Sequence, residues 1–367
     1  MKINFIDLHR QYKQNKTAID AGIQEVIANT AFIMGPHVRQ LENELAEYVG
    51  VGHAVGCASG TDALMLALMA YDIQPDDEII TSPFTFIATA EVIALLKARP
   101  VFVDIREDTF NIDPSKIEAA ITEKTKGIIA VDIFGQCADY DEINSIAREH
   151  GLFVIEDAAQ SFGAKYKNRQ AGSLADIGCT SFFPAKPLGC FGDGGMVFSD
   201  DANVAAQIGS LRVHGQGADR YDNIRIGLNG RLDTLQAAIL LAKFKIYPEE
   251  ISQRQDAAAY YRQGLRGVIH QAIPDDCQSV YAQYSIRVPD RTALREHLKT
   301  KGIPTAIYYP RSLHQQKAFS GLGYKNGDFP IAEKICNDIL AIPMHAYLTK
   351  DEQDFIIKHI NTFYQKG

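Results

Sequence analysis

The 367-residue sequence lacks several features that would assign it to common classes of protein. It has no excess of basic residues, and its formal net charge of −8 argues against general nucleic-acid binding, which needs a basic surface. No apolar run approaches the roughly 20 residues that a membrane-spanning helix requires. We therefore expect neither nucleic acid nor membrane among its partners.

Cysteine is sparse and scattered. The six cysteines include no CxxC pair, which argues against a zinc ribbon or a redox motif, and we expect no metal site. Isolated cysteines fit a reducing compartment better than a disulfide framework. The N-terminal residues 1–7 lack the apolar core of a signal peptide, so we expect a cytoplasmic protein. No G-x-G-x-x-G follows the first predicted strand, which excludes a Rossmann dehydrogenase.

What the sequence does contain is an alternation of strands and helices that begins at Ala54. This pattern predicts an α/β fold with a mainly parallel central sheet, helices on both faces, and a ligand site at the carboxyl ends of the strands. Two amphipathic helices are expected before it, within residues 13–49. We predict a large domain over residues 1–248 and a smaller α+β domain over 249–367. The predicted strands span residues 54–57, 78–81, 100–104, 127–133, 152–156, 179–183, 196–199, 284–288 and 307–309.

One lysine has unusual surroundings. Lys186 lies in the segment Ser181–Gly195, flanked by prolines and glycines rather than by other charges. A strand upstream ends in the carboxylate Asp157. A loop lysine paired with a distant carboxylate is what an enzyme of pyridoxal phosphate (PLP) needs, since the lysine holds the cofactor as a Schiff base and the carboxylate keeps the pyridine nitrogen protonated. Alternatively, Asp157 caps the helix that follows it.

Two further groups of residues could contact such a cofactor. Gly60 and Thr61 open a predicted helix, whose free N–H groups suit a phosphate, although Ser59-x-x-Asp62 also resembles a capping box. Ser181 could supply another phosphate donor.

Two more residues, one polar and one aromatic, have an equally ordinary alternative. Gln160 could reach the phenolic oxygen of the cofactor, or simply start a helix. Phe86 could stack on the pyridine ring, or belong to the core with Phe84.

Several separate motifs occur in one order, and together they make the chain resemble the DegT/DnrJ/EryC1/StrS sugar aminotransferases over almost its whole length. The segments that carry the resemblance are Cys57–Leu64, Glu156–Ser161, Ser181–Gly189, Gly192–Gly195 and Asn229–Ala238. The resemblance implies PLP fold type I, like aspartate aminotransferase, and a homodimer with active sites at the interface.

The resemblance also implies roles for individual residues. It gives Lys186, Asp157, Gln160, Phe86, Gly60, Thr61 and Ser181 the cofactor contacts described above. It adds Asn229 as a phosphate contact from the partner chain. It further implies three substrate-side residues that are donated across the interface, namely Arg231, Tyr309 and His314.

Some members of this family carry histidine in place of the lysine and act as dehydratases, so Lys186 favours transamination. L-glutamate would donate the amine and leave as 2-oxoglutarate, and a nucleotide-linked keto-sugar would accept it. The lysine loop looks most like that of members that aminate C3 of UDP-2-acetamido-2-deoxy-3-keto-glucuronic acid for lipopolysaccharide O-antigen synthesis. Arg231 would then pair with the uronate carboxylate. The alternatives are a dTDP-3-keto-6-deoxyhexose 3-aminotransferase and a PLP-binding regulator without turnover.

Overall fold

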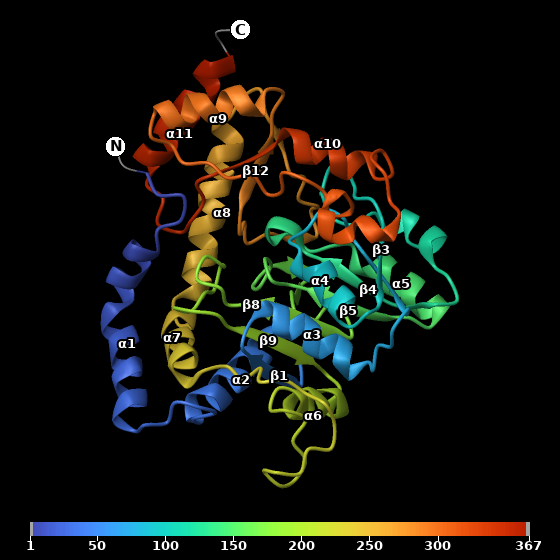
Figure 1. The fold of residues 1–367 in the computed structure, drawn as a ribbon. Coiled ribbons are helices and arrows are strands. Elements are labelled where there is room, and N and C mark those ends of the chain that lie inside the picture. The colour runs from blue at the N-terminus through green and yellow to red at the C-terminus, as the bar shows by residue number, and fades with distance from the viewer. Residues whose placement is uncertain (1–2, 365–367) are drawn as a thin grey trace.

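A seven-stranded sheet forms the centre of the molecule. The computed structural model describes residues 3–364, and Figure 1 shows the chain as a ribbon. The sheet lies in the order β1-β9-β8-β5-β4-β2-β3. Its strands are β1 (His53–Cys57), β2 (Glu78–Thr81), β3 (Arg99–Phe102), β4 (Thr125–Val131), β5 (Phe153–Asp157), β8 (Ile177–Ser181) and β9 (Gly195–Ser199). All neighbours are parallel except β9, which is antiparallel to both β1 and β8, so the predicted mainly parallel sheet is confirmed.

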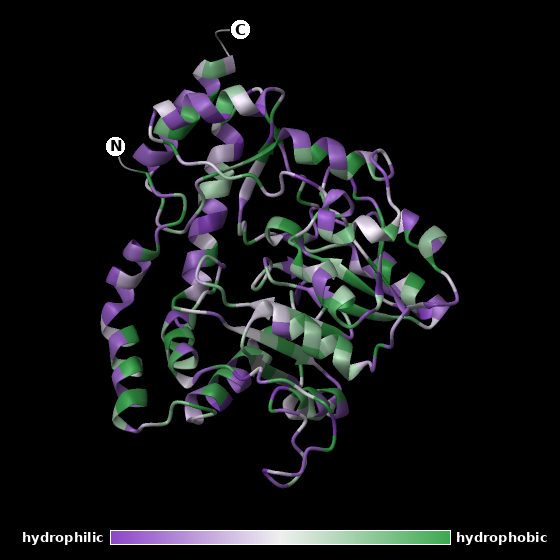
Figure 2. Cartoon of the chain, in the orientation of Figure 1, coloured by the Kyte–Doolittle hydropathy of each residue, from purple (hydrophilic) through white to green (hydrophobic). Residues whose placement is uncertain are grey.

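Two hydrophobic layers cover the two faces of this sheet. Successive side chains in a strand point to opposite faces, so Ile128 and Val154 lie in one layer, and Ile129 and Ile155 lie in the other. The first layer is completed by α2 (Pro36–Val49), α5 (Tyr140–His150) and α7 (Thr234–Phe244), and the second by α3 (Gly60–Ala70), α4 (Ala88–Leu95) and α6 (Ala202–Leu211). Figure 2 shows the apolar residues concentrated on the central strands and on α3.

The two predicted N-terminal helices are present. Helix α1 (Leu8–Ala28) begins earlier than expected, because the Asp7 side chain accepts a hydrogen bond from the N–H of Arg10 and caps it. Helix α2 starts at Pro36, which suits the first turn because a proline has no N–H to leave unpaired there. Both helices pack against α7, as Figure 1 shows for α1.

The segment 234–264 forms two helices. Helix α7 ends at Phe244, and α8 (Tyr247–Gly264) begins three residues later with Pro248 in its first turn. The break lies just before Pro248, since a proline is accommodated in the first turn of a new helix. Helix α8 leads away from the central sheet toward the C-terminal region (Figure 1).

The C-terminal region is built on a small antiparallel sheet of order β10-β12-β13. Its elements are β10 (Ile269–His270), β12 (Tyr284–Arg287), α9 (Arg291–Thr300), α10 (Pro330–Asp338), β13 (Ile339–Ile342) and α11 (Lys350–Tyr364). A third sheet contains β11 (Cys277–Gln278), β6 (Lys165–Tyr166) and β7 (Arg169–Gln170). Short 3-10 helices span Pro114–Lys116, Glu118–Ala120, Ile133–Gly135, Leu313–Gln315 and Lys317–Leu322.

The strand predicted over 307–309 does not form. Only Ala306 bridges to the small sheet, through Ala341, and the chain then turns away from it. The residues 307–309 are half-buried, and Tyr308 and Tyr309 line the pocket described below.

One hydrophobic cluster joins the two predicted domains. Phe84 and Phe134 from the first part of the chain lie together with Phe319 and Phe329 from the last part. The boundary between residues 248 and 249 stays a prediction. Within residues 3–364, none of the helices has both the length and the apolar character needed to cross a membrane.

Candidate active site

The strand ends at the centre of the sheet open onto a pocket of about 460 Å³. Asp157 ends β5, Ser181 ends β8, and the N-terminus of α3 lies beside them. Eight of the predicted site residues line this one pocket: Gly60, Thr61, Phe86, Asp157, Gln160, Ser181, Lys186 and Tyr309. The structure therefore brings together residues that lie up to about 250 positions apart in the chain, as expected for a site at the carboxyl edge of an α/β sheet.

Asp157 is held in the floor of the pocket by two donors. Its Oδ2 accepts a hydrogen bond from Thr89 Oγ1 at 2.7 Å, and its Oδ1 accepts one from the N–H of Ala159 at 3.2 Å. The Thr89 hydroxyl in turn accepts from Thr85 Oγ1 at 3.1 Å. Burial raises the pKa of Asp157, while Thr89 and the charge of Lys186 act against that rise. A cationic nitrogen placed against this carboxylate would complete its partners.

Lys186 reaches the same pocket from the loop between β8 and β9. Its backbone N–H donates to the carbonyl oxygen of Phe183 at 2.8 Å, which forms a turn at the lysine. Burial lowers the pKa of Lys186 to about 8, and the negative charge of Asp157 opposes this shift. A lysine with such a pKa is partly neutral near physiological pH, as a nucleophile or proton acceptor must be.

A phosphate-sized cradle lies between α3 and the end of β8. The Ser59 hydroxyl accepts from the N–H of Asp62 at 3.0 Å, so the capping interpretation is correct. The cap leaves the first N–H groups of α3, at Gly60 and Thr61, without a helical partner. Gly60 is required here, because a Cβ on it would lie 2.6 Å from the Cβ of Ser181. Both the cap and the anion cradle are therefore compatible with this sequence.

Gln160 and Tyr309 meet at another wall of the pocket. The Gln160 side chain accepts from the N–H of Phe134 at 2.9 Å and donates to the Tyr309 hydroxyl at 3.3 Å. Burial raises the pKa of Tyr309, so it stays a neutral phenol. The Tyr309 ring packs edge-on against Phe84, with 6.0 Å between centroids. The hydrogen bond from the Phe134 backbone thus fixes the orientation of the Gln160 side chain.

The two phenylalanines of the loop after β2 have different environments. Phe84 is 1% exposed and belongs to the core, whereas Phe86 is 56% exposed and lines the pocket. Stacking of Phe86 on a cofactor ring stays a prediction, and the position of its side chain permits it.

Three predicted residues do not line this pocket. Asn229 is exposed, and its backbone bridges to Val213. Arg231 bridges by its backbone to Cys57 at the end of β1, and its side chain lines a different pocket. His314 is buried, with its Nε2 3.0 Å from Glu333 Oε1.

The expectation that Tyr309 is donated across an interface is therefore corrected, whereas a role of His314 across an interface stays a prediction. Tyr309 lies in the pocket of its own chain, and the ring of His314 turns inward, 4.7 Å from the ring of Phe329. For Asn229 and Arg231 a role across an interface stays a prediction.

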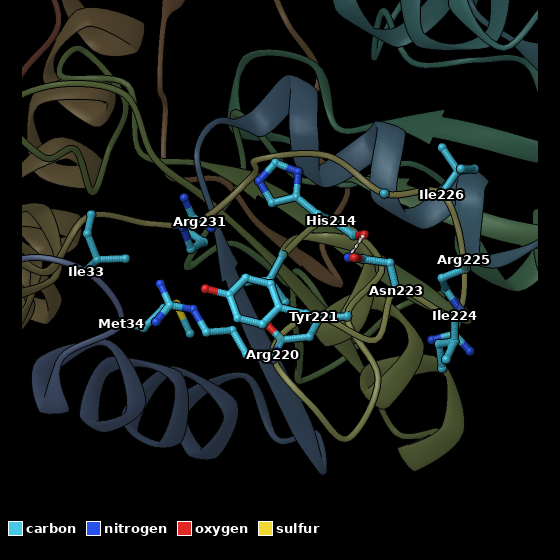
Figure 3. A pocket seen from close by; sticks show the side chains of 13 residues that line it. Ile33, Met34, His214, Arg220, Tyr221, Asn223, Ile224, Arg225, Ile226 and Arg231 are labelled. Carbon is cyan, nitrogen blue, oxygen red and sulfur yellow. Dashed lines mark hydrogen bonds between the residues drawn. The ribbon is translucent and has the colours of Figure 1, made fainter.

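The second pocket, of about 990 Å³, is shown in Figure 3. It lies between the turn before α2 and the segment 213–231, and four basic side chains line it: His214, Arg220, Arg225 and Arg231. The Nε of Arg231 is buried and has no hydrogen-bond partner. Large apolar side chains on its rim are also exposed, among them Tyr221 and Ile226, each 88% exposed. This pocket combines a basic lining with exposed apolar side chains on its rim.

Sequence reasoning missed Thr89, which is buried and holds the Asp157 carboxylate. A threonine in an apolar helix resembles core filling, and only its spacing of four residues from Thr85 could have drawn notice. Phe5 and Ile6, near the N-terminus, also line the pocket. Within residues 3–364, no cluster of histidine, cysteine and acidic side chains is arranged to hold a metal ion.

The residues of the pocket match three chemical groups of pyridoxal phosphate. A buried carboxylate, an amine of lowered pKa and a helix N-terminus match its ring nitrogen, its aldehyde and its phosphate. The site can thus hold a flat anionic aldehyde and move protons beside it.

Comparisons with known proteins support this description. The sequence profile of the DegT/DnrJ/EryC1/StrS aminotransferase family matches residues 13–361. The chain is 49% identical to UDP-2-acetamido-2-deoxy-3-oxo-D-glucuronate aminotransferase of Pseudomonas aeruginosa, over 94% of this chain and 96% of that protein. It is 44% identical to a pleiotropic regulatory protein of Geobacillus stearothermophilus, over 100% and 99% of the two chains.

A solved structure connects the fold to the cofactor. NtdA from Bacillus subtilis with bound cofactor PMP, the amine form of pyridoxal phosphate, has a TM-score of 0.93. The two chains are 30% identical, and the match covers 99% of this chain and 85% of the NtdA chain. The PLP fold of type I predicted from the sequence is confirmed, and so is the cofactor.

Proposed function

Because the chain belongs to the DegT/DnrJ/EryC1/StrS aminotransferase family, we propose that this sugar aminotransferase moves the amino group of L-glutamate to C3 of UDP-2-acetamido-2-deoxy-3-keto-glucuronic acid. The observation that carries the proposal is the 49% identity to the Pseudomonas aeruginosa enzyme across almost the whole chain. The product would enter lipopolysaccharide O-antigen synthesis. The predicted cytoplasmic location suits an enzyme that acts on nucleotide sugars.

Six residues of the pocket would each face one part of the cofactor. The N–H groups of Gly60 and Thr61, with the Ser181 hydroxyl, would hold the phosphate. Asp157 would face the ring nitrogen, Gln160 the ring oxygen, and Phe86 one face of the ring. When bound, pyridoxal phosphate supplies an aldehyde that exchanges amines and a ring that accepts electrons.

Lys186 would then have two tasks. It would hold the cofactor covalently when no amino donor is bound, and its amine, when free, would take up and release the proton that amine transfer has to move. Its pKa of about 8 suits both directions of transfer near neutral pH. Asp157, kept charged by Thr89 and by the ring nitrogen, would stabilise the electron-rich stage of the reaction.

The second pocket supports a homodimer with shared active sites. Exposed apolar side chains around one hollow (Ile33, Tyr221, Ile224 and Ile226) favour burial against another protein surface. A second copy would bring Asn229 and Arg231 toward the partner's cofactor. The basic lining would receive the diphosphate and the uronate carboxylate. Light scattering of wild type and Ile226→Asp tests this, and an unchanged mass for the variant would contradict it.

Amine transfer to a panel of sugars tests the proposed substrate. The holoenzyme is incubated with glutamate and UDP- or dTDP-linked 3-keto sugars, with and without the C6 carboxylate, and products are read by mass spectrometry. We expect the UDP-linked uronate to react fastest. Faster reaction of the dTDP-linked 6-deoxy sugars would instead favour the dTDP-3-keto-6-deoxyhexose assignment.

The regulator alternative requires a separate measurement, because one relative is named as a regulatory protein. Glutamate should change the visible absorbance of the bound cofactor. Borohydride reduction before that addition should leave the cofactor attached to Lys186 in a peptide map. An absorbance that no amino donor changes would favour a binding protein without turnover.

A further inference from the structure

Helix α7 carries a buried lysine under the loop that holds Lys186. Lys243, near the end of α7, is 1% exposed, and its Nζ donates a hydrogen bond to the carbonyl oxygen of Gly189. The same Nζ lies 5.6 Å from the centroid of the Phe191 ring. Burial lowers the pKa of Lys243 to about 8, although the charge of Glu250 opposes the shift. The Lys243 amine thus contacts the carbonyl oxygen of Gly189 and the ring of Phe191, which lie a few residues after Lys186.

A second residue of α7 holds the same loop. The Gln236 side chain accepts a hydrogen bond from the N–H of Phe191 at 2.8 Å. Gln236 and Lys243 are seven residues apart, so they lie two turns apart on one face of the helix. This face supports the outgoing arm of the lysine loop at two points.

Backbone contacts within the loop connect these two supports to Lys186. The N–H of Lys186 donates to the carbonyl oxygen of Phe183. A Cβ on Gly189 would lie 2.6 Å from the carbonyl oxygens of both Phe183 and Pro184, so the two arms of the loop are in backbone contact. A shift of Gly189 must therefore be passed on to the turn that carries Lys186.

Stability alone does not call for a lysine at this position. A buried ammonium is costly, and an apolar side chain of similar volume would avoid that cost. Lys243 also follows the segment Asn229–Arg231 along the chain, through the length of α7. The helix that supports the lysine loop thus begins at the proposed partner-facing segment.

We propose that Lys243, together with Gln236, is a positioning residue that fixes the Lys186 amine over the reacting carbon by holding the backbone of its loop. The inference rests on the proposed role of Lys186. Neither residue lines the cofactor pocket, so each acts through the loop and not on the substrate. Because a small misplacement of a catalytic group is costly to the rate, the anchor should affect turnover more than binding.

The test compares Lys243→Met with the matched control Lys245→Met, which changes an exposed lysine two residues further on. Holoenzymes are mixed with an amino donor that wild type accepts, and the single-turnover rate is followed by cofactor absorbance. We expect Lys243→Met to lose about tenfold or more in rate, with KM within about twofold of wild type. The pH midpoint of the visible absorbance should also shift, which a purely structural role would not cause.

A third variant separates the hydrogen bond from the charge. Lys243→Gln keeps a donor for Gly189 without the ammonium and should recover most of the lost rate. Equal rates for wild type and Lys243→Met would overturn the proposal. If Lys243→Met does not fold, Gln236→Met decides the question, because it removes the other support. An unchanged rate there also overturns the proposal.

These outcomes differ from a failure of the proposed function itself. In that case the wild-type protein would form no borohydride-stable adduct at Lys186, or would show no absorbance change with any amino donor. The variants are interpreted only against a wild type that does both.

Discussion

Thr89 allows a quantitative test of the site, because its hydroxyl holds the carboxylate of Asp157. Thr89 is 1% exposed, and the hydrogen bond to Asp157 Oδ2 is 2.7 Å long. Replacement by valine keeps the shape of the side chain and removes the donor. A hydrogen bond to a charged group contributes about 1.5–3 kcal/mol, and burial leaves no water to replace it.

We expect this loss to appear mainly as weaker cofactor binding. Asp157 must be charged to face the ring nitrogen, whereas burial raises its pKa and the Thr89 hydrogen bond acts against that rise. Without this donor, the charged form that the cofactor needs is less stable. The difference predicts an affinity about ten- to hundredfold lower in Thr89→Val, at about 1.4 kcal/mol per tenfold. Equilibrium dialysis against pyridoxal phosphate measures this directly.

Thr85→Val is the control for this measurement. The Thr85 hydroxyl is also buried, but it bonds to Thr89 at 3.1 Å and not to the carboxylate. Thr85→Val should change cofactor affinity by only about threefold or less. It also removes a buried hydrogen bond, here between two neutral hydroxyls, and should therefore lower the free energy of unfolding. If Thr89→Val and Thr85→Val bind the cofactor equally well, the reasoning about Asp157 is refuted.

Three further predictions follow from single contacts. Arg231→Ala should lower kcat/KM for a uronate sugar by about tenfold or more relative to its non-acidic counterpart; equal use of both sugars would remove Arg231 from recognition. Gly60→Ala places a Cβ 2.6 Å from the Cβ of Ser181 and should cost about 1–3 kcal/mol in urea unfolding, together with weaker cofactor binding, and an unchanged midpoint would contradict the close approach. Cofactor uptake by the apoprotein should accelerate as pH rises through about 8, where the Lys186 amine becomes neutral; a rate independent of pH in stopped-flow absorbance would oppose this.

Most of the central fold could be predicted because its strands are buried on both faces and appear as continuous apolar runs. The small sheet was harder, since β10 and β11 are two residues long and carry little pattern. The segment 307–309 was wrongly predicted as a strand, because an apolar and aromatic triplet looks the same whether it enters a sheet or a pocket.

The site was predictable where chemistry and chain position coincide. A lysine in a loop of prolines and glycines and a carboxylate at the end of a strand are both typical of a ligand site, so the sequence predicted that Lys186 and Asp157 would lie in one pocket. The choice between Phe84 and Phe86 could not be made, because both lie in one short loop and only tertiary packing separates them. Which residues would face the proposed second copy also depends on packing, and no local pattern in the sequence of one chain identifies them.

The antiparallel strand β9 determines how the reactive loop can move. Since β8 and β9 pair directly, Lys186 lies on a long hairpin between two strands that are buried along their whole length. Lids in α/β enzymes usually open by local fluctuation at the rim, but the base of this loop can separate only if the pairing of β8 with β9 breaks. The amides of Phe182 and Cys190, at the base of the hairpin, should exchange with solvent only on global unfolding. If Lys186 has the proposed role, the backbone that carries it would stay in place while other segments admit the substrate.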